Sequence, residues 1–261
     1  MSDPNAPVAS MKALASARSP SLSDDVLHRK LTSHTALPAS ISAHLANLAQ
    51  GVKTYKAGAL IAVSGDPLDQ ATLMVEGLAC RSRVLADGRR QILSLVVPGD
   101  IIDAHASLLD RRHDNIEALS ACRIARTPQS QLAAVSLAYP LLGEALQREA
   151  LIEGAISREW VANVGRRSTL EALAHLICEM ALRMDAVGLV QKGAFPFELT
   201  QQDLADALGV TAIYLNRMLK RLRHTGMIAV RGRTLEVLEW DTLRRLADFN
   251  PGYLHLEQAA A

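Results

Sequence analysis

The sequence is poor in cysteine and has no long apolar run. Its 261 residues include three cysteines, Cys80, Cys122 and Cys178, and no two of them form a CxxC pair. Thiols that are few and far apart supply neither a disulfide framework nor a metal signature, which is typical of the reducing cytosol. No apolar stretch approaches the roughly 18 residues of a membrane span, and the N-terminus carries no signal-peptide pattern. We therefore expect a cytoplasmic protein with no membrane contact.

The sequence also lacks a recognisable catalytic grouping and an excess of charge. No Ser/His/Asp set, phosphate-binding glycine loop or carboxylate pair stands out, so we do not expect an enzyme. The net charge is +1, and binding to an anionic partner must therefore depend on a local basic cluster. The length favours about two domains, and nearly half of the residues are hydrophobic, which is enough for a sizeable core.

The most informative stretch is LTQQDLADALGVTAIYLNRMLKRL, residues 199–222. Counting from Gln201, the small Ala205 stands fifth, Gly209 ninth and the apolar Leu215 fifteenth. This order is typical of a helix-turn-helix, because the small residue lets two helices cross closely and the glycine supplies the backbone freedom of the turn. The stretch predicts a DNA-binding motif.

The second helix of the motif, expected at about Thr211–His224, is the predicted recognition helix. Its N-terminal part is the part that reaches base edges in the major groove. Arg217 is suited to a guanine and Asn216 to an adenine or a phosphate. The residues expected on its outward face are Thr211, Ala212, Ile213, Asn216, Arg217 and Lys220.

Basic residues continue beyond this helix. Between Arg217 and Arg233 there are six Lys and Arg residues, both ends included, and no Asp or Glu, which favours phosphate binding. Thr200, with Asp203, is placed to cap the first helix. The alternative is a helical pair packed for structure, with a solvated basic face. The residues expected to contact DNA are Thr200, Gln201, Thr211, Ala212, Ile213, Asn216, Arg217, Lys220, Arg221, Arg231 and Arg233.

Residues 51–127 show short apolar segments separated by turn residues. Asp87-Gly88 is the strongest hairpin signal in the chain. Regular short strands of this kind favour a β-roll or barrel of the jelly-roll type, which has room for a small ligand. The expected strands are Val52–Tyr55, Leu60–Val63, Ala71–Glu76, Leu78–Ala86, Arg90–Val97 and Ile116–Arg126, the last as one strand or a pair.

A helical period returns after residue 128, with a short helix and then a long one. The long helix has a wide apolar stripe and is expected to end at Gly165. Such a stripe favours a two-helix dimer seam, the alternative being a core helix of the same chain. Ser168 and Glu171 predict a capping box for the next helix. The residues assigned to the dimer interface are Leu142, Leu146, Ile152, Ile156 and Trp160.

The ends of the chain carry weaker signals. The Ser-, Ala- and Pro-rich first 24 residues predict a disordered tail, and short helices are expected at Asp25–Thr32 and Ile41–Ala49, the second capped by Ser40. After the recognition helix, segments 227–230 and 234–238 predict a hairpin with basic residues at its tip, either a DNA-binding wing or a plain edge hairpin. A final helix is expected at Trp240–Asp248.

In this order of elements the chain resembles the family of the cyclic-AMP receptor protein and FNR, the Crp/Fnr transcription regulators, over about residues 45–240. The resemblance rests on Gly65-Asp66, DGRRQI at 87–92, PGD at 98–100 and the helix-turn-helix. The segment 158–180, REWVANVGRRSTLEALAHLICEM, is similar to an alphaproteobacterial subgroup. The resemblance implies an α+β fold with a cyclic-nucleotide-binding-like β-roll, a long dimerisation helix and a winged helix-turn-helix.

The resemblance also implies a homodimer that binds a palindromic DNA site and regulates transcription together with RNA polymerase. The half-sites would lie about 34 Å apart. The expected divisions are a tail 1–24, a sensor roll 25–138, a dimerisation helix 139–164, a DNA-binding domain 165–250 and a C-terminal tail 251–261.

Two departures from the family bear on the effector. Cyclic-AMP-binding members carry a Gly-Glu pair after the PGD turn and an Arg-Ser/Thr-Ala motif, where this chain has Asp103-Ala104 and RRHDN at 111–115. Without the ribose acceptor, and with Asp103 beside the phosphate position, we do not expect cyclic AMP. An iron–sulfur cluster is not expected either, because the oxygen sensors of the family use four cysteines, mostly near the N-terminus.

The effector therefore stays open between an unknown ligand and none. The residues assigned to a ligand pocket are Asp103, Ala104, His105, Arg112 and His113. A metal or haem at the histidines and carboxylates of this loop matches no known ligand spacing, and surface histidines are expected instead. Two further hypotheses are a ligand-binding module whose C-terminal domain contacts protein, and a constitutive regulator without a ligand.

Overall fold

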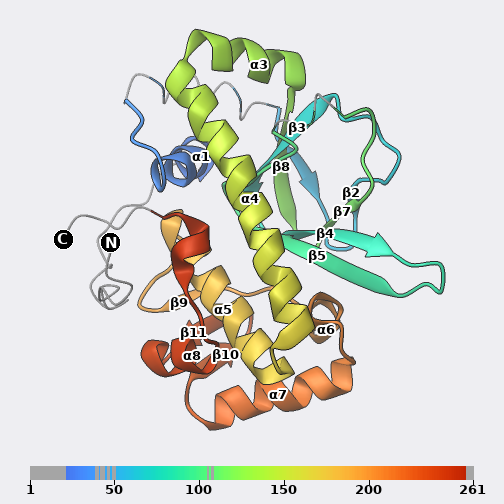
Figure 1. The fold of residues 1–261 in the computed structure, drawn as a ribbon, viewed down its shortest axis with the longest axis vertical. Helices are drawn as coiled ribbons and strands as arrows, with labels where there is room; N and C mark the ends of the chain where they lie inside the picture. The colour runs from blue at the N-terminus through green and yellow to red at the C-terminus, as the bar shows by residue number, and fades with distance from the viewer. Residues whose placement is uncertain are drawn as a thin grey trace.

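The computed structural model consists of a β-roll, a long central helix and a C-terminal helical domain with a small sheet (Figure 1). The long helix runs from the end of the molecule that holds α3 (Gln129–Ala138) to the end that holds α7 (Ala212–His224), with the roll against one side of it. The structure describes residues 22–38, 41, 45, 48, 51–104, 106 and 109–256.

The roll consists of two four-stranded sheets that face each other. Their strand orders are β1-β8-β3-β6 and β2-β7-β4-β5, and every pairing is antiparallel. Apolar side chains from both sheets fill the space between them, as in a jelly roll. The strands are β1 Lys53–Tyr55, β2 Leu60–Ala62, β3 Gln70–Glu76, β4 Ala79–Val84, β5 Arg90–Val96, β6 Ile101–Ile102, β7 Asn115–Ala118 and β8 Cys122–Pro128.

The hairpin predicted at Asp87-Gly88 is present and joins β4 to β5. Val84 pairs with Arg90, and Gly88 has a φ of +84°, which only glycine adopts easily. The two-residue β6 was not predicted, because a strand this short leaves no pattern. The segment predicted as one strand or a pair over 116–126 is two strands, and the turn between them packs against Gly77. A Cβ there would clash with the Ala121 carbonyl.

The helices lie mostly where the apolar periods predicted them. Ser168 and Glu171 form the predicted capping box of α5. The prediction that the long helix α4 stops at Gly165 was wrong, because Gly165 keeps helical geometry and α4 continues to Arg166. The helices not yet bounded are α1 Leu22–Thr32, α4 Pro140–Arg166, α5 Thr169–Ala186, α6 Gln201–Leu208, α8 Trp240–Leu246 and the 3₁₀ turn η4 Pro251–Leu254.

Both predicted tails contain regular structure. Helix α1 begins at Leu22, inside the segment expected to be disordered, and η4 lies inside the expected C-terminal tail. The predicted helix at Asp25–Thr32 is present as part of α1. Residues 1–21, the cap at Ser40 and most of the helix predicted at Ile41–Ala49 lie outside the described residues. Within the described part of the chain, no helix is long and apolar enough to cross a membrane.

The side chains assigned to the dimer interface are core residues of the same chain, which corrects that assignment. Leu142 and Leu146 pack into a cluster with α1 and β3, whereas Ile152, Ile156 and Trp160 pack into the larger cluster around α5. All five are almost fully buried without any second chain. The apolar periodicity of the sequence correctly predicts that this face is buried, but it does not show whether the same chain or a second chain covers it.

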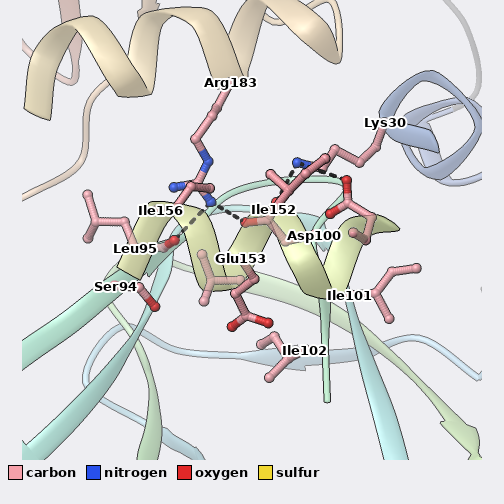
Figure 2. Close-up of a pocket in the computed structure, with 12 residues that line it drawn as sticks. Lys30, Ser94, Leu95, Asp100, Ile101, Ile102, Ile152, Glu153, Ile156 and Arg183 are labelled. Atoms are coloured by element: carbon pink, nitrogen blue, oxygen red, sulfur yellow. Dashed lines mark hydrogen bonds and ion pairs between the residues drawn. The ribbon is translucent and has the colours of Figure 1, made fainter. Parts of the chain in front are cut away.

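A chain of buried ion pairs connects the parts of the fold. Lys30 of α1 and Arg183 of α5 converge on Asp100, in the turn after β5, at 3.2 and 2.6 Å (Figure 2). Lys30 also pairs with Glu149 of α4 at 3.4 Å, and Arg183 with Glu179 at 3.1 Å. Burial alone would raise the pKa of Asp100, but Arg183 and Lys30 outweigh it and hold that pKa below its usual range.

We expect Arg183→Leu to destabilise the protein by about 3–5 kcal/mol, because it leaves the carboxylates of Asp100 and Glu179 buried without their shared cation. Urea unfolding followed by circular dichroism measures the difference. The matched control is Arg148→Ala, which breaks the exposed pair with Glu144 at 3.5 Å and should cost about 0–1 kcal/mol. Equal losses in the two variants would contradict the role of Arg183.

Candidate nucleic-acid interface

The helix-turn-helix has the geometry that its residues predict. Thr200 and Asp203 cap α6 reciprocally: the Thr200 hydroxyl accepts the Asp203 amide at 3.1 Å, and the Asp203 carboxylate accepts the Thr200 amide at 2.9 Å. Gly209 ends α6 in the left-handed region, with a φ of +66°. Ala205 and Leu215 are fully buried where α6 and α7 cross. The motif therefore forms a rigid unit that presents the outer face of α7.

The outer face of α7 combines an apolar residue with cations. Ile213 is 78% exposed, and Arg217, Lys220 and Arg221 are exposed further along the helix. The Arg217 guanidinium lies 5.1 Å from the ring centroid of Tyr214, a cation–π contact. Tyr214 was not among the predicted site residues, although its position between Ile213 and Arg217 could have indicated it.

Some of the predicted contact residues have partners within the motif. The Thr211 hydroxyl accepts the Tyr214 amide at 3.3 Å and caps α7. The Asn216 amide donates to Gln201 of α6 at 2.7 Å, which joins the exposed ends of the two helices. Ala212 is half-buried. Thr211 and Asn216 thus hold the motif together while lying on its outer surface.

The predicted hairpin after α7 is present and has a third strand. Strands β10 (Ile228–Arg231) and β11 (Thr234–Val237) pair across a tight turn, and β9 (Ala194–Pro196) pairs with the other edge of β11. Arg231 and Arg233 are exposed at the tip, and Arg233 pairs with Glu198 at 2.9 Å. The tip borders an open cleft of about 460 Å³ between this domain and the roll.

Arg90 of the β4–β5 hairpin attaches the motif to the roll. Its guanidinium bonds Asp206 of α6 at 2.8 Å, Asp203 at 2.5 Å and Glu117 of the roll at 2.9 Å. Because Asp203 also caps α6, the bond from the roll reaches the residue that orients the start of the motif. Figure 1 shows α6 close to this hairpin.

The residues assigned to a ligand pocket only partly come together. Asp103 and Arg112 form a buried ion pair, Ala104 is buried, and His113 is exposed. His105 lies outside the described residues. Among the residues that the structure describes, no group of histidine, cysteine and carboxylate side chains is arranged to hold a metal ion.

The cavity between the roll and α4 is small. Its volume is about 30 Å³, and it lies between strands β5 and β6 on one side and Ile152, Glu153 and Ile156 on the other (Figure 2). This is about the space of one water molecule, whereas sites for small-molecule ligands measure roughly 300–1,000 Å³. Lys30, Asp100 and Arg183 at its edge are already paired with one another.

The three cysteines and one histidine have core positions. Cys80, Cys122 and Cys178 are buried and unpaired, and burial raises the pKa of Cys80 to about 12. A thiol with such a pKa stays protonated and unreactive at neutral pH. His175, which no pattern singled out, is buried on α5 against Phe249, and burial lowers its pKa to about 4.

Comparisons with known proteins agree with this geometry. The model of the Crp-like helix-turn-helix domain matches residues 171–246, and the model of the cyclic nucleotide-binding domain matches residues 52–139. The transcriptional activator protein FnrL of Cereibacter sphaeroides is 29% identical over 185 residues, which cover 69% of this chain and 73% of FnrL. The nitrogen fixation regulation protein FixK of Azorhizobium caulinodans is 28% identical over 67% of this chain and 70% of its own length.

The solved structures support the fold. The structure of FixK2 from Bradyrhizobium japonicum superposes with a TM-score of 0.67 at 22% identity, over 75% of this chain and 96% of that one. A Crp-family regulator of Thermus thermophilus, TTHB099, gives a TM-score of 0.60 at 20% identity and covers 79% of this chain. The predicted α+β architecture of roll, long helix and helix-turn-helix is confirmed, and the relatives named here are regulators, not enzymes.

We expect Arg90→Met to destabilise the protein by about 1–3 kcal/mol, because Asp203, Asp206 and Glu117 lose a shared cation that is mostly shielded from solvent. Hydrogen exchange should also become faster in α6. Arg89→Met is the matched control: the neighbouring arginine is exposed, pairs with Asp87 alone, and should change stability by no more than about 0.5 kcal/mol. Unchanged exchange in α6 would show that Arg90 does not attach the motif.

Proposed function

The chain belongs to the Crp/Fnr family of DNA-binding transcriptional regulators, and on that premise we propose that it acts as a homodimer on a palindromic DNA site. The observation that carries this proposal is the outer face of α7. It lies at the end of the molecule away from α3 (Figure 1) and presents Ile213 and Arg217 to solvent, and Arg217 begins the basic stretch that continues to Arg233. In a dimer, two such helices would enter successive major grooves about 34 Å apart.

The contacts of α7 support a division of roles. Arg217 is suited to a guanine, and its contact with the Tyr214 ring holds the guanidinium in place before DNA arrives. Ile213 offers an apolar contact to a thymine methyl group. Lys220 and Arg221, and Arg231 and Arg233 in the wing, would contact phosphates. Thr200, Gln201, Thr211 and Asn216 would position the two helices and supply polar contacts, and Ala212, like Ile213, would make an apolar contact.

The exposed face of α4 supports a dimer seam different from the one first assigned. Leu151 is 67% exposed and Val161 is 74% exposed, on the face opposite the buried stripe. The positions that share this face with them follow one another along the helix at alternating intervals of four and three residues, which is the spacing of a two-helix coiled coil. Small residues on this face would let two copies of α4 approach closely. The proposed seam is Gln147, Leu151, Gly154, Arg158, Val161 and Gly165.

The small size of the cavity in the roll argues against a cyclic nucleotide as the effector. The cavity against α4 has about the space of one water molecule, and Arg112, the buried arginine of the segment RRHDN at 111–115, is already paired with Asp103. We therefore propose that cyclic AMP is not the effector. The chain's own ion pairs hold the roll against α4 in the described arrangement.

The experiment that tests the function is selection of DNA sites from a random-sequence pool with the purified protein and no added ligand. We expect a palindrome with half-sites about one helical turn apart. If nothing is selected and binding to bulk DNA does not change across a salt series, the alternative of a C-terminal domain that contacts protein replaces the proposal.

On the selected site, we expect Arg217→Ala to weaken binding by about 1–3 kcal/mol and to relax the base preference at one position of each half-site. The matched variant is Lys220→Ala, which should weaken all sequences alike and flatten the salt dependence, because it removes a phosphate contact. Fluorescence anisotropy against the site and its single-base variants measures both. An unaltered base preference in Arg217→Ala would contradict its role in base recognition.

We expect Leu151→Asp to dissociate the dimer, because it places two facing charges in the proposed seam. Sedimentation velocity at fixed protein concentration measures the effect. Leu137→Asp is the control, because Leu137 is 83% exposed on α3, outside the proposed seam. Ile156→Asp should unfold the protein instead, since Ile156 is a core residue. A dimer that persists in Leu151→Asp would place the interface elsewhere.

A further inference from the structure

Asp103 lies at the centre of a buried cluster of charges on the roll. Its carboxylate accepts a bond from Arg81 of β4 at 3.0 Å and forms a close ion pair with Arg112. Its backbone carbonyl accepts the Gln129 amide at 2.6 Å. Three side chains from separate parts of the roll domain thus converge on one residue.

The backbone of Asp103 shows how strongly this position is constrained. Its φ is +63°, in the left-handed region that few residues other than glycine, asparagine and aspartate adopt. Such a conformation costs about 1 kcal/mol or more and persists only where surrounding contacts hold it. The bonds to Arg81, Arg112 and Gln129 are those contacts, so they keep the carboxylate in place.

The cluster also reaches the long helix. Arg81 bonds Asp114 at 2.7 Å and Glu153 of α4 at 2.7 Å. Arg112 lies 3.5 Å from Asp114. Two arginines and three carboxylates therefore tie the roll to α4 by ion pairs that belong entirely to this chain.

Arg112 has donor groups that are not used in hydrogen bonds within the described residues. It is almost completely buried, and among the described residues its Nε has no hydrogen-bond partner and its Nη1 has only the longer ion pair with Asp114 at 3.5 Å. A guanidinium carries five donors in a fork that matches an oxyanion, and a buried one needs an anion close by. In this structure the carboxylate of Asp103 is the nearest such anion, and that of Asp114 lies 3.5 Å away on the other Nη atom.

We propose that Asp103 is a built-in anion, whose carboxylate occupies the place where Arg112 and Arg81 would otherwise bind a phosphate-like ligand. The roll therefore holds α4 without an effector, and removal of the carboxylate uncovers an anion site. The consequence for DNA binding rests on the proposed function, whereas the anion site itself does not.

The test is Asp103→Gly, which removes the carboxylate and suits the left-handed backbone. Melting temperatures are measured in sodium phosphate and in sodium chloride at equal ionic strength and pH. The controls are the natural protein and Asp110→Gly, which removes an exposed carboxylate from the same loop. They measure the stabilisation that phosphate gives to any folded protein without binding a site. The phosphate concentration is set at about ten times the Kd of phosphate for Asp103→Gly. Phosphate should then raise the melting temperature of Asp103→Gly by about 3–6 °C more than that of either control.

An equal rise in all three proteins would overturn the inference, and so would saturable phosphate binding by the natural protein in calorimetry. If Asp103→Gly does not fold, Asp103→Asn keeps the side-chain volume and tolerates the backbone. The same extra rise is then expected, because an amide does not neutralise Arg112.

DNA binding provides an independent measurement on the selected site. Asp103→Gly should bind about fivefold more weakly than the natural protein in chloride and recover when phosphate replaces chloride at equal ionic strength. Wild-type affinity for DNA in chloride would contradict the coupling to α4. If the natural protein binds no DNA under any condition, the proposed function fails, and the melting experiment still decides whether Asp103 fills an anion site.

Discussion

The ion pairs at Asp100 are the interaction on which the arrangement of the whole chain depends. One carboxylate in a turn of the roll meets Lys30 of the N-terminal helix and Arg183 of α5, which lies in the part of the chain that matches the Crp-like helix-turn-helix domain. Buried charges are stable only when each has its counter-charge in good geometry, because both have lost their contact with water. Apolar surfaces tolerate sliding, whereas these pairs specify one position of the roll against α1 and α5.

Two further charge clusters connect other pairs of structural elements by buried or partly buried ion pairs. Arg90 connects the β4–β5 hairpin to the first helix of the DNA-binding motif, and Arg81 connects β4 to Glu153 of the long helix. Each of these connections consists of a few ion pairs that fix one position of the two elements relative to each other.

The two faces of α4 show why an apolar sequence pattern does not by itself identify an interface with a second chain. One face of α4 holds Ile156 and Trp160 inside the chain, while the opposite face leaves Leu151 and Val161 in solvent. The buried face is the more apolar one, and for that reason the sequence pattern pointed to it. Exposed apolar residues that no part of the same chain covers are the better evidence for a partner.

Local interactions explain what the sequence alone determined. The helix-turn-helix followed from a small residue, a glycine and a buried leucine at fixed spacing, and the hairpin at Asp87-Gly88 and the cap at Ser168 depend on near neighbours in the chain. Only the tertiary structure decided which partners the long-range groups meet: that Asp103 neutralises Arg112, that Arg90 reaches Asp203, and which face of α4 is covered. Arg90 and Asp203 lie 113 positions apart in the chain, whereas Asp103 and Arg112 lie nine apart. No local period specifies either pair, because such contacts depend on how whole elements pack.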